Sequence, residues 1–209
     1  MARRLEVKRI DPKLSHEWIL NRHYAARLCP ISYCFGGFVD DELVGIITYG
    51  TPVSPTLRTG LAGHEYASRV LELNRLTCIN KPNYASQIIA KSLKLLPSPK
   101  IIVSYADTSQ DHIGIVYQAT NFIYTGLSAK RSDWKIKGMD LHSASIADLA
   151  RGQPNRAQYL RDTYGDRFYS APRPRKHRYV ILVGNKRDRK VMKKALKYPI
   201  KPYPKRESD

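Results

Sequence analysis

The chain has 209 residues, of which 42% are hydrophobic, so it can form a full core, and its length predicts a single domain. It lacks an apolar run of about eighteen residues and an apolar N-terminal signal segment, which argues against a membrane span and against secretion. It also lacks C-x-x-C spacing, which argues against a disulfide framework and a zinc motif. We therefore expect a cytoplasmic protein, and its net charge of +18 indicates a polyanionic partner such as nucleic acid or an anionic membrane surface.

The first predicted elements are a hairpin, a strand and a helix. Two apolar runs in residues 33–52 are joined by Asp40 and Asp41, which is typical of a hairpin turn. Residues 68–79, SRVLELNRLTCI, mix apolar and polar positions as a strand does. Residues 83–97 place apolar side chains at helical spacing, with Asn83 as the expected N-cap.

The next predicted elements complete an α/β fold. Residues 100–107, KIIVSYAD, form a short apolar run that indicates a strand buried on both faces. The following residues 109–122 predict a helix, and residues 123–129 and 178–184 predict two closing strands. Strand, helix, strand and helix imply a right-handed crossover, so we expect a mixed central β-sheet flanked by helices.

The part between the closing strands is predicted to be a basic helical insertion. Ser145 and Asp148 resemble a capping box at the start of one helix, and NRAQYLRDTYG predicts a second. We expect a core of residues 1–137 and 177–185, an insertion of residues 138–176 and a basic tail of residues 186–209. Residues 130–209 hold 22 Lys and Arg against 8 Asp and Glu, whereas residues 1–129 hold 14 against 10. The positive charge is therefore concentrated in the C-terminal part.

Polar residues follow the buried strand at the point where α/β sheets bind ligands, beside helix N-termini. Ser104, Tyr105 and Asp107 lie there, although Asp107 could equally close a turn beside a capping Ser109. Other polar groups that could converge on this point are His23, Tyr24, Asn74, Arg75, Tyr117 and Asn121. The stretch fits both a reaction centre and an ordinary strand-to-helix turn.

The order of these elements resembles the GNAT acyltransferase superfamily. The motifs HYAAR, ELNRL, VSYAD, VYQATNFIYTG, YGDRFY and PRKHRYV look like the Mom family of bacteriophage DNA-modification proteins, over about residues 20–205. This resemblance implies an enzyme of the bacterial host's cytoplasm that converts adenine in double-stranded DNA to N6-carbamoylmethyl (acetamido) adenine and so blocks restriction.

The resemblance also implies roles for individual residues. Tyr117 matches the tyrosine that protonates the leaving group in many GNAT enzymes, and the polar positions around the substrate match His23, Tyr24, Ser104 and Asp107. Acetyl-CoA or another small-molecule donor is implied, and iron held by His23 and Asp107 is a further possibility. The candidate donor-binding residues are Asn74, Arg75, Asn83 and Ser86. The glycine-rich turn with which GNAT enzymes hold the coenzyme A pyrophosphate is replaced here by NKPNYASQ.

DNA contacts are expected from the basic residues that precede the last strand, where the sheet would hold them in place: Arg173, Arg175, Lys176, His177 and Arg178. The last dozen residues are expected to be a solvated tail. Two other functions stay open on the sequence, a conventional N-acetyltransferase acting on a protein or tRNA amine and a basic DNA-binding protein without activity.

Overall fold

A seven-stranded sheet forms the centre of the computed structural model, which describes residues 4–24, 26–141 and 143–206. The strand order is β1-β2-β3-β4-β5-β9-β6. In chain order the elements of this sheet have the following bounds: β1 Glu6–Arg9, β2 Tyr33–Val39, β3 Glu42–Gly50, β4 Val70–Cys78, β5 Lys100–Asp107, β6 Ile123–Leu127 and β9 Lys176–Val183. Of the strands that the structure describes, only β4 and β5 pair in parallel, so the predicted α/β fold with a mixed central sheet is confirmed.

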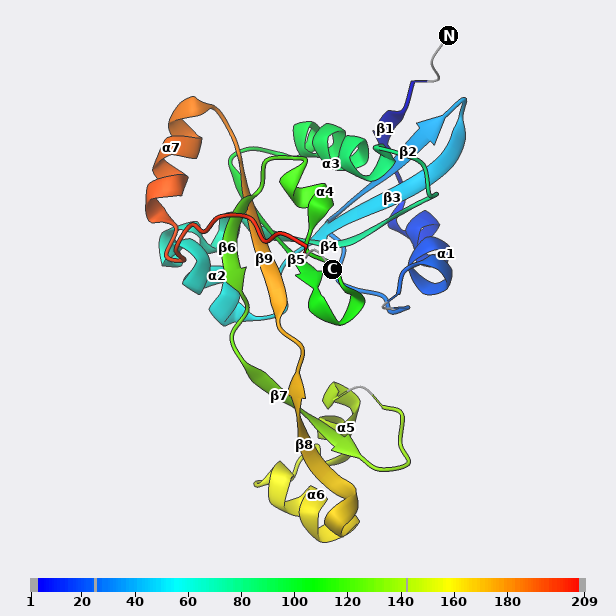
Figure 1. Ribbon diagram of the computed structural model, residues 1–209, viewed down its shortest axis with the longest axis vertical. Helices are drawn as coiled ribbons and strands as arrows, with labels where there is room; N and C mark the ends of the chain where they lie inside the picture. The colour runs from blue at the N-terminus through cyan, green and yellow to red at the C-terminus, as the bar shows by residue number, and fades with distance from the viewer. Residues whose placement is uncertain (1–3, 25, 142, 207–209) are drawn as a thin grey trace.

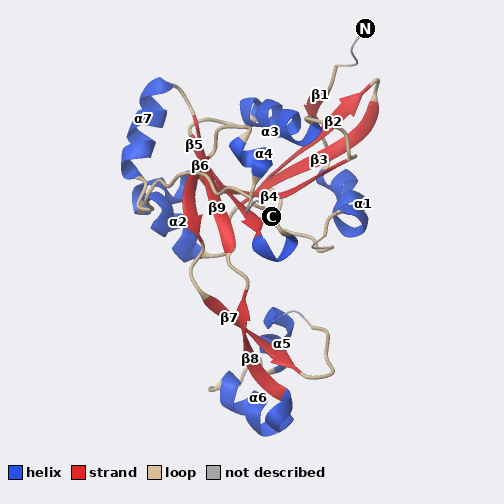
Figure 2. Cartoon of the chain, viewed as in Figure 1, coloured by secondary structure: helices blue, strands red, loops and turns tan. Residues whose placement is uncertain are grey.

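Helices cover both faces of the sheet (Figure 2). One face carries α3 (Tyr84–Leu95) and α4 (Ile115–Gln118), and the other carries α2 (Pro55–Ala62) and α7 (Lys186–Ala195). Helix α1 (Pro12–Arg22) packs Trp18 and Ile19 against Ile46 of β3. Within the described residues, no helix is both long and apolar enough to cross a membrane.

A second unit, which we name the arm, extends away from the core along the long axis of the molecule (Figure 1). It contains β7 (Arg131–Ile136), α5 (Ser143–Leu149), α6 (Arg156–Tyr164) and β8 (Phe168–Arg173). Among the described strands these two pair with each other and with no other strand, and a small separate core consists of Ile136, Ile146, Ala150 and Leu160. Residues 138–176, predicted as a helical insertion, thus share this β-ribbon with residues that precede them.

Several predicted elements agree with the structure. Asp40 and Asp41 adopt positive φ angles of 50° and 62° in the turn that joins β2 to β3, as expected of a tight hairpin. Strand β5 is buried along most of its length, and β6 and β9 are the two expected closing strands. The helix predicted over residues 83–97 is α3.

Three details of the prediction are wrong. The helix expected over residues 109–122 is a short 3-10 turn followed by α4, because Asp111 and Gly114 adopt left-handed conformations that interrupt it. Asn83 precedes α3 but is itself left-handed, and its side chain makes no capping hydrogen bond to the described residues. Helix α5 begins at Ser143 rather than at Ser145, and Asp148 pairs with Arg151 at 2.9 Å.

Candidate active site

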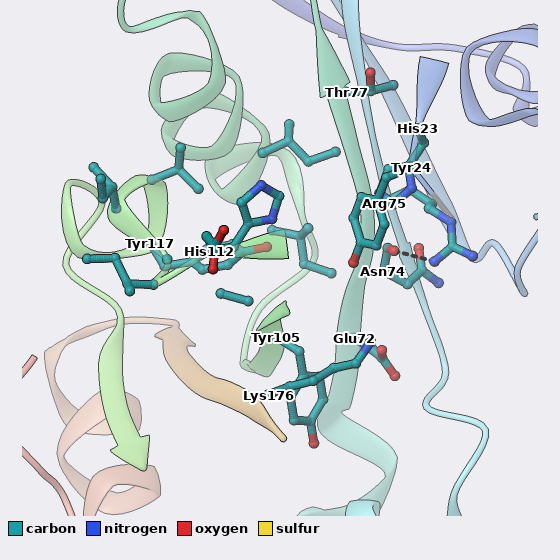
Figure 3. Close-up of a pocket in the computed structure, with 18 of the residues that line it drawn as sticks. His23, Tyr24, Glu72, Asn74, Arg75, Thr77, Tyr105, His112, Tyr117 and Lys176 are labelled. Carbon is teal, nitrogen blue, oxygen red and sulfur yellow. Dashed lines mark hydrogen bonds between the residues drawn. The ribbon is translucent and has the colours of Figure 1, made fainter. Parts of the chain in front are cut away.

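The site lies where β4 and β5 separate. Their parallel pairing runs from Val70↔Ile101 to Glu72↔Val103, and the described residues show no pairing between the two strands beyond it. A β-bulge at Asn74, where β4 changes register against β3, turns the strand at the same point. A cavity of about 550 Å³ opens there between β4, β5, α4 and the end of α1 (Figure 3). We name it the first cavity.

Tyr117 forms the inner wall of the first cavity, and the buried Ser104 lies behind it without lining the cavity. The Ser104 hydroxyl lies 2.9 Å from the carbonyl oxygen of Leu73 and 2.9 Å from the Tyr117 hydroxyl, so it spans the gap between the separated strands. Burial raises the pKa of Tyr117 to about 12, against the opposing effect of the Ser104 hydrogen bond. Tyr117 is therefore a protonated phenol at neutral pH. When Ser104 donates its single proton to Tyr117, the phenol proton is available to a bound molecule.

His23 and Tyr24 lie on the opposite side of the cavity, directly after α1. Their rings stack with centroids 4.6 Å apart, and Tyr24 meets His112 edge-on at 5.9 Å. Burial, followed by the charges of Arg75, His112 and Lys176, lowers the pKa of His23 to about 4. His23 is therefore a neutral imidazole at neutral pH, and it faces a cavity with positive walls.

Asn74 and Arg75 hold the segment that follows Tyr24. The Arg75 guanidinium donates from Nε and Nη2 to the carbonyl oxygen of Arg27, at 3.2 and 2.7 Å. The Asn74 amide donates to the carbonyl oxygen of Pro30 at 2.8 Å and accepts from Thr48 at 2.6 Å. Both side chains line the cavity, and these bonds tie them to the backbone at Arg27 and Pro30.

Asp107 ends β5 and forms a turn, which is one of the two roles that the sequence allowed for it. It accepts hydrogen bonds from the Ser109 backbone N–H at 3.0 Å and hydroxyl at 2.7 Å, and it pairs with Lys176 Nζ at 2.7 Å. Burial alone would raise the pKa of Asp107, but the hydrogen bonds from Lys176 and Ser109 and the Lys176 charge outweigh it and lower the pKa. The carboxylate is ionised and already accepts hydrogen bonds from Ser109 and Lys176, so it is a weak base.

Of the remaining predicted residues, Tyr105 and Lys176 line the first cavity and the others lie outside it. Asn83 and Ser86 bond to each other at the start of α3, at 3.0 Å, and neither lines the first cavity. Five predicted DNA-binding residues lie in the neck between core and arm: Arg173, Arg175, Lys176, His177 and Arg178. Arg173 pairs with Asp133, Arg175 donates to the Ser128 carbonyl, and His177 bonds to Tyr124.

Arg178 differs from its neighbours because it is buried. Its guanidinium donates to the hydroxyl and the carbonyl oxygen of Thr125 and lies 3.4 Å from the centre of the Tyr198 ring. Its guanidinium is therefore engaged inside the protein, and a phosphate contact of Arg178 stays a prediction.

The residues proposed to hold iron do not fit a metal site. Within the described part of the chain, no three His, Cys, Asp or Glu side chains gather as metal ligands. The carboxylate of Asp107 is engaged by Lys176 and Ser109, and the charges of Arg75 and Lys176 act on His23. Such an environment repels a cation and favours an anion.

One residue that matters here, Glu72, was not among the predicted site residues, whereas Tyr105 and Lys176 were named from the sequence. Glu72, Tyr105 and Lys176 line the first cavity and also a second cavity of about 500 Å³, which opens towards α2 and the neck. Figure 3 shows them grouped in the lower part of the view. Burial raises the pKa of Glu72, in spite of the opposing charges of Arg75 and Lys176. The ELNRL motif predicted polar residues at this place, but only the separation of β4 from β5 shows that Glu72 adjoins both cavities.

Comparison with known proteins agrees with the sequence motifs. The model of the Mom protein family matches residues 4–205. The chain is 28% identical, over 98% of its length and 85% of the relative's, to "Methylcarbamoylase mom" of Escherichia phage Mu. Solved structures with a weaker likeness include a GNAT-family acetyltransferase from Bacillus cereus, with a TM-score of 0.44 and 12% identity over 87% of this chain and 99% of that one. A probable acetyltransferase from Staphylococcus epidermidis has a TM-score of 0.46, with 10% identity over 87% and 100%. Likeness at that level carries no argument about activity.

Proposed function

We propose that this chain, which belongs to the Mom protein family, is a transferase that modifies DNA. Its substrate would be adenine, whose exocyclic amine N6 would receive a carbamoylmethyl group, and the product would protect phage DNA from restriction. The name of the phage Mu relative supports the class of group that is transferred. The net charge of +18 supports a DNA substrate, since phosphate neutralisation supplies most non-specific affinity for duplexes.

The observation that carries the proposal is the meeting of the two cavities at Glu72, Tyr105 and Lys176. A transferase acting on a base must bring a small donor and a base turned out of the helix into contact. The first cavity would take the donor, because Tyr117 and His23 line it. The second would take the adenine, because it opens at the neck, where Arg131 and Arg173 lie.

The side chains at this meeting point divide the proton transfers between them. Glu72 would accept the proton that leaves N6 as the new N–C bond forms, and its raised pKa makes it a better base than Asp107. Tyr117 would donate its proton to the leaving group as the donor's bond breaks, and Ser104 would hold the phenol in position. His23 would contact the donor as a neutral imidazole.

The donor is proposed to be an activated small molecule that carries the carbamoylmethyl group on the leaving group that Tyr117 protonates. Acetyl-CoA, the other proposed donor, would supply only the acetyl carbons, and its use would require a separate nitrogen source for the amide. The missing glycine-rich turn, and the absence of Ser86 from the lining of the first cavity, support a position for the anionic part of the donor away from the start of α3. Arg75 and Lys176 are cations of the first cavity that could face such an anion.

Mass spectrometry of nucleosides from cells that express the protein tests the function. We expect a modified deoxyadenosine with the wild type, less than about one hundredth of it with Glu72→Gln, and an unchanged amount with Glu65→Gln, a carboxylate outside both cavities. DNA that stays unmodified in the wild type would defeat the proposal. Acetylated protein or tRNA in the same cells would then favour the conventional N-acetyltransferase, and binding of duplex DNA without any modified product would favour the DNA-binding protein.

A further inference from the structure

The last described residues, 196–206, form an ordered strap across the core, although the sequence predicts a solvated tail. Lys197 N–H donates to the Leu61 carbonyl at 3.0 Å, and Lys201 N–H donates to the Tyr124 carbonyl at 2.9 Å. Figure 1 shows the strap, in red, running from α7 across β6 and β9 towards the centre of the sheet. It therefore covers strand β6, which is the edge of the sheet.

Tyr203 fixes the end of the strap beside the site. Its hydroxyl donates to the carbonyl oxygen of Phe122 at 2.7 Å, and the Gln118 amide donates to the carbonyl oxygen of Pro204 at 3.3 Å. The Tyr203 ring lies 6.3 Å from that of Tyr179, which in turn lies 5.3 Å from Tyr117. The strap is thus packed through one ring against the phenol at the inner wall of the first cavity.

Arg206, at the end of the strap, lines the first cavity. The other cations of that cavity have partners in the protein: Arg22 lies 4.1 Å from the Trp18 ring centre, Arg75 donates to Arg27, and Lys176 pairs with Asp107. No hydrogen bond or ion pair joins Arg206 to another residue that the structure describes. Its charge is therefore available to a molecule in the cavity.

We infer that Arg206 binds a phosphate group of the donor in the first cavity and that the strap holds it there. An arginine presents a planar set of N–H donors that suits a phosphate oxygen pair. This contact would replace the glycine-rich turn that the chain lacks before α3. The inference rests on the proposed function, because that function assigns the first cavity to the donor.

Calorimetric titration of the full chain with coenzyme A, in the absence of DNA, tests the contact. We expect Arg206→Gln to weaken coenzyme A binding at least about tenfold, the size expected for a lost charged hydrogen bond. Lys205→Gln removes the same charge one residue earlier on an exposed side chain outside the cavity, and it should change the affinity less than about twofold. Equal affinities for Arg206→Gln and the wild type would overturn the inference, as would a wild type that does not bind coenzyme A.

Tyr203→Phe tests the positioning role of the strap. Without its hydrogen bond to Phe122, the strap should hold Arg206 less well, so coenzyme A binding should weaken about threefold. The same change in an Arg206→Gln background should have no further effect on affinity, a coupling that a general loss of stability would not produce. Independent effects of the two changes would overturn the positioning role.

The phosphate could also belong to DNA, and binding of a duplex oligonucleotide separates the two sources. Arg206→Gln should leave duplex affinity unchanged, and a loss confined to the duplex would overturn the inference. A wild type that binds coenzyme A through Arg206 but leaves DNA unmodified would refute the proposed function and uphold the role of Arg206. If the wild type modifies DNA but Arg206→Gln has no effect on coenzyme A binding, the proposed function is upheld and the role of Arg206 is refuted.

Discussion

At the scale of single residues, the environment of a side chain decides what it can do. Two tyrosines in this chain share the same chemistry, since Tyr117 bonds to Ser104 at 2.9 Å and Tyr49 bonds to Ser92 at 2.7 Å. Both are buried, and burial raises the pKa of both. They differ in that only Tyr117 lines the first cavity, so only its proton can reach a bound molecule.

Replacing Tyr117 by Phe therefore tests its role directly. We expect Tyr117→Phe to lower the modification rate by about 10²–10⁴, the usual contribution of a positioned acid, and to cost about 1 kcal/mol of unfolding free energy. Tyr49→Phe should cost a similar free energy and leave the rate unchanged. Rates from nucleoside mass spectrometry and urea unfolding of both variants measure this, and equal rates for the two variants would exclude Tyr117 as the acid.

His23 should titrate far from the usual range of histidine. Its folded pKa of about 4 lies below the ordinary value of 6.5, so the folded chain disfavours the imidazolium. Stability that depends on neutral His23 is complete above pH 6.5 and falls as the pH drops from 6.5 towards 4. NMR titration should show a histidine signal with a midpoint near 4 that His23→Gln lacks, whereas a midpoint near 6.5 would contradict the effect of partial burial on the ring.

At the scale of elements, the short helix α4 depends on one close packing contact. Gly114 precedes α4 with a φ of +81°, and a Cβ at this position would overlap the ring of Tyr179. The Tyr179 hydroxyl in turn donates to the Ile113 carbonyl. The backbone therefore turns into α4 directly on top of an aromatic ring, and this turn places Tyr117 beside Ser104.

Gly114→Ala should accordingly destabilise the protein by more than backbone strain alone. Gly152 in the arm has a similar φ of +87°, and a Cβ added there would meet no described atom within 4 Å, so Gly152→Ala reports strain without overlap. We expect about 1 kcal/mol for Gly152→Ala and at least about 3 kcal/mol for Gly114→Ala in urea unfolding. Equal losses would mean that Tyr179 moves aside without cost.

At the scale of the whole molecule, the neck brings the second cavity next to the arm. Arg131 begins β7 and Arg173 ends β8, and both line that cavity. Because the arm projects from the core at this place (Figure 1), a duplex that contacts the arm would pass the opening of the second cavity. This arrangement supports the proposed DNA site in the neck.

Arg131 is the exposed cation that should meet a phosphate there. We expect Arg131→Gln to weaken binding to duplexes of any sequence and to reduce the slope of log affinity against log salt by about one. Lys94→Gln, an exposed change on α3 at the other face of the sheet, should leave the slope unchanged. Fluorescence anisotropy at several salt concentrations measures both slopes, and a slope unchanged by Arg131→Gln would remove the neck from the DNA site.

The sequence by itself determined the parts of this protein that depend on near neighbours. The hairpin at Asp40 and Asp41, the buried strand β5 and the helix α3 follow from turn chemistry and from the period of apolar residues. The ordered motifs also predicted the family, and His23, Tyr24, Asn74, Arg75 and Tyr117 do line one cavity.

Tertiary structure alone decided which of these residues meet and which groups they face. The β7–β8 ribbon pairs Arg131 with Arg173, and the strap brings Arg206 to a cavity whose other walls lie far away in the sequence. Such pairings depend on sheet register and loop closure, for which the period of apolar residues carries no signal. For the same reason the sequence predicted Asp107 as a candidate base. Only the register of β5 against β9 places Lys176 opposite its carboxylate.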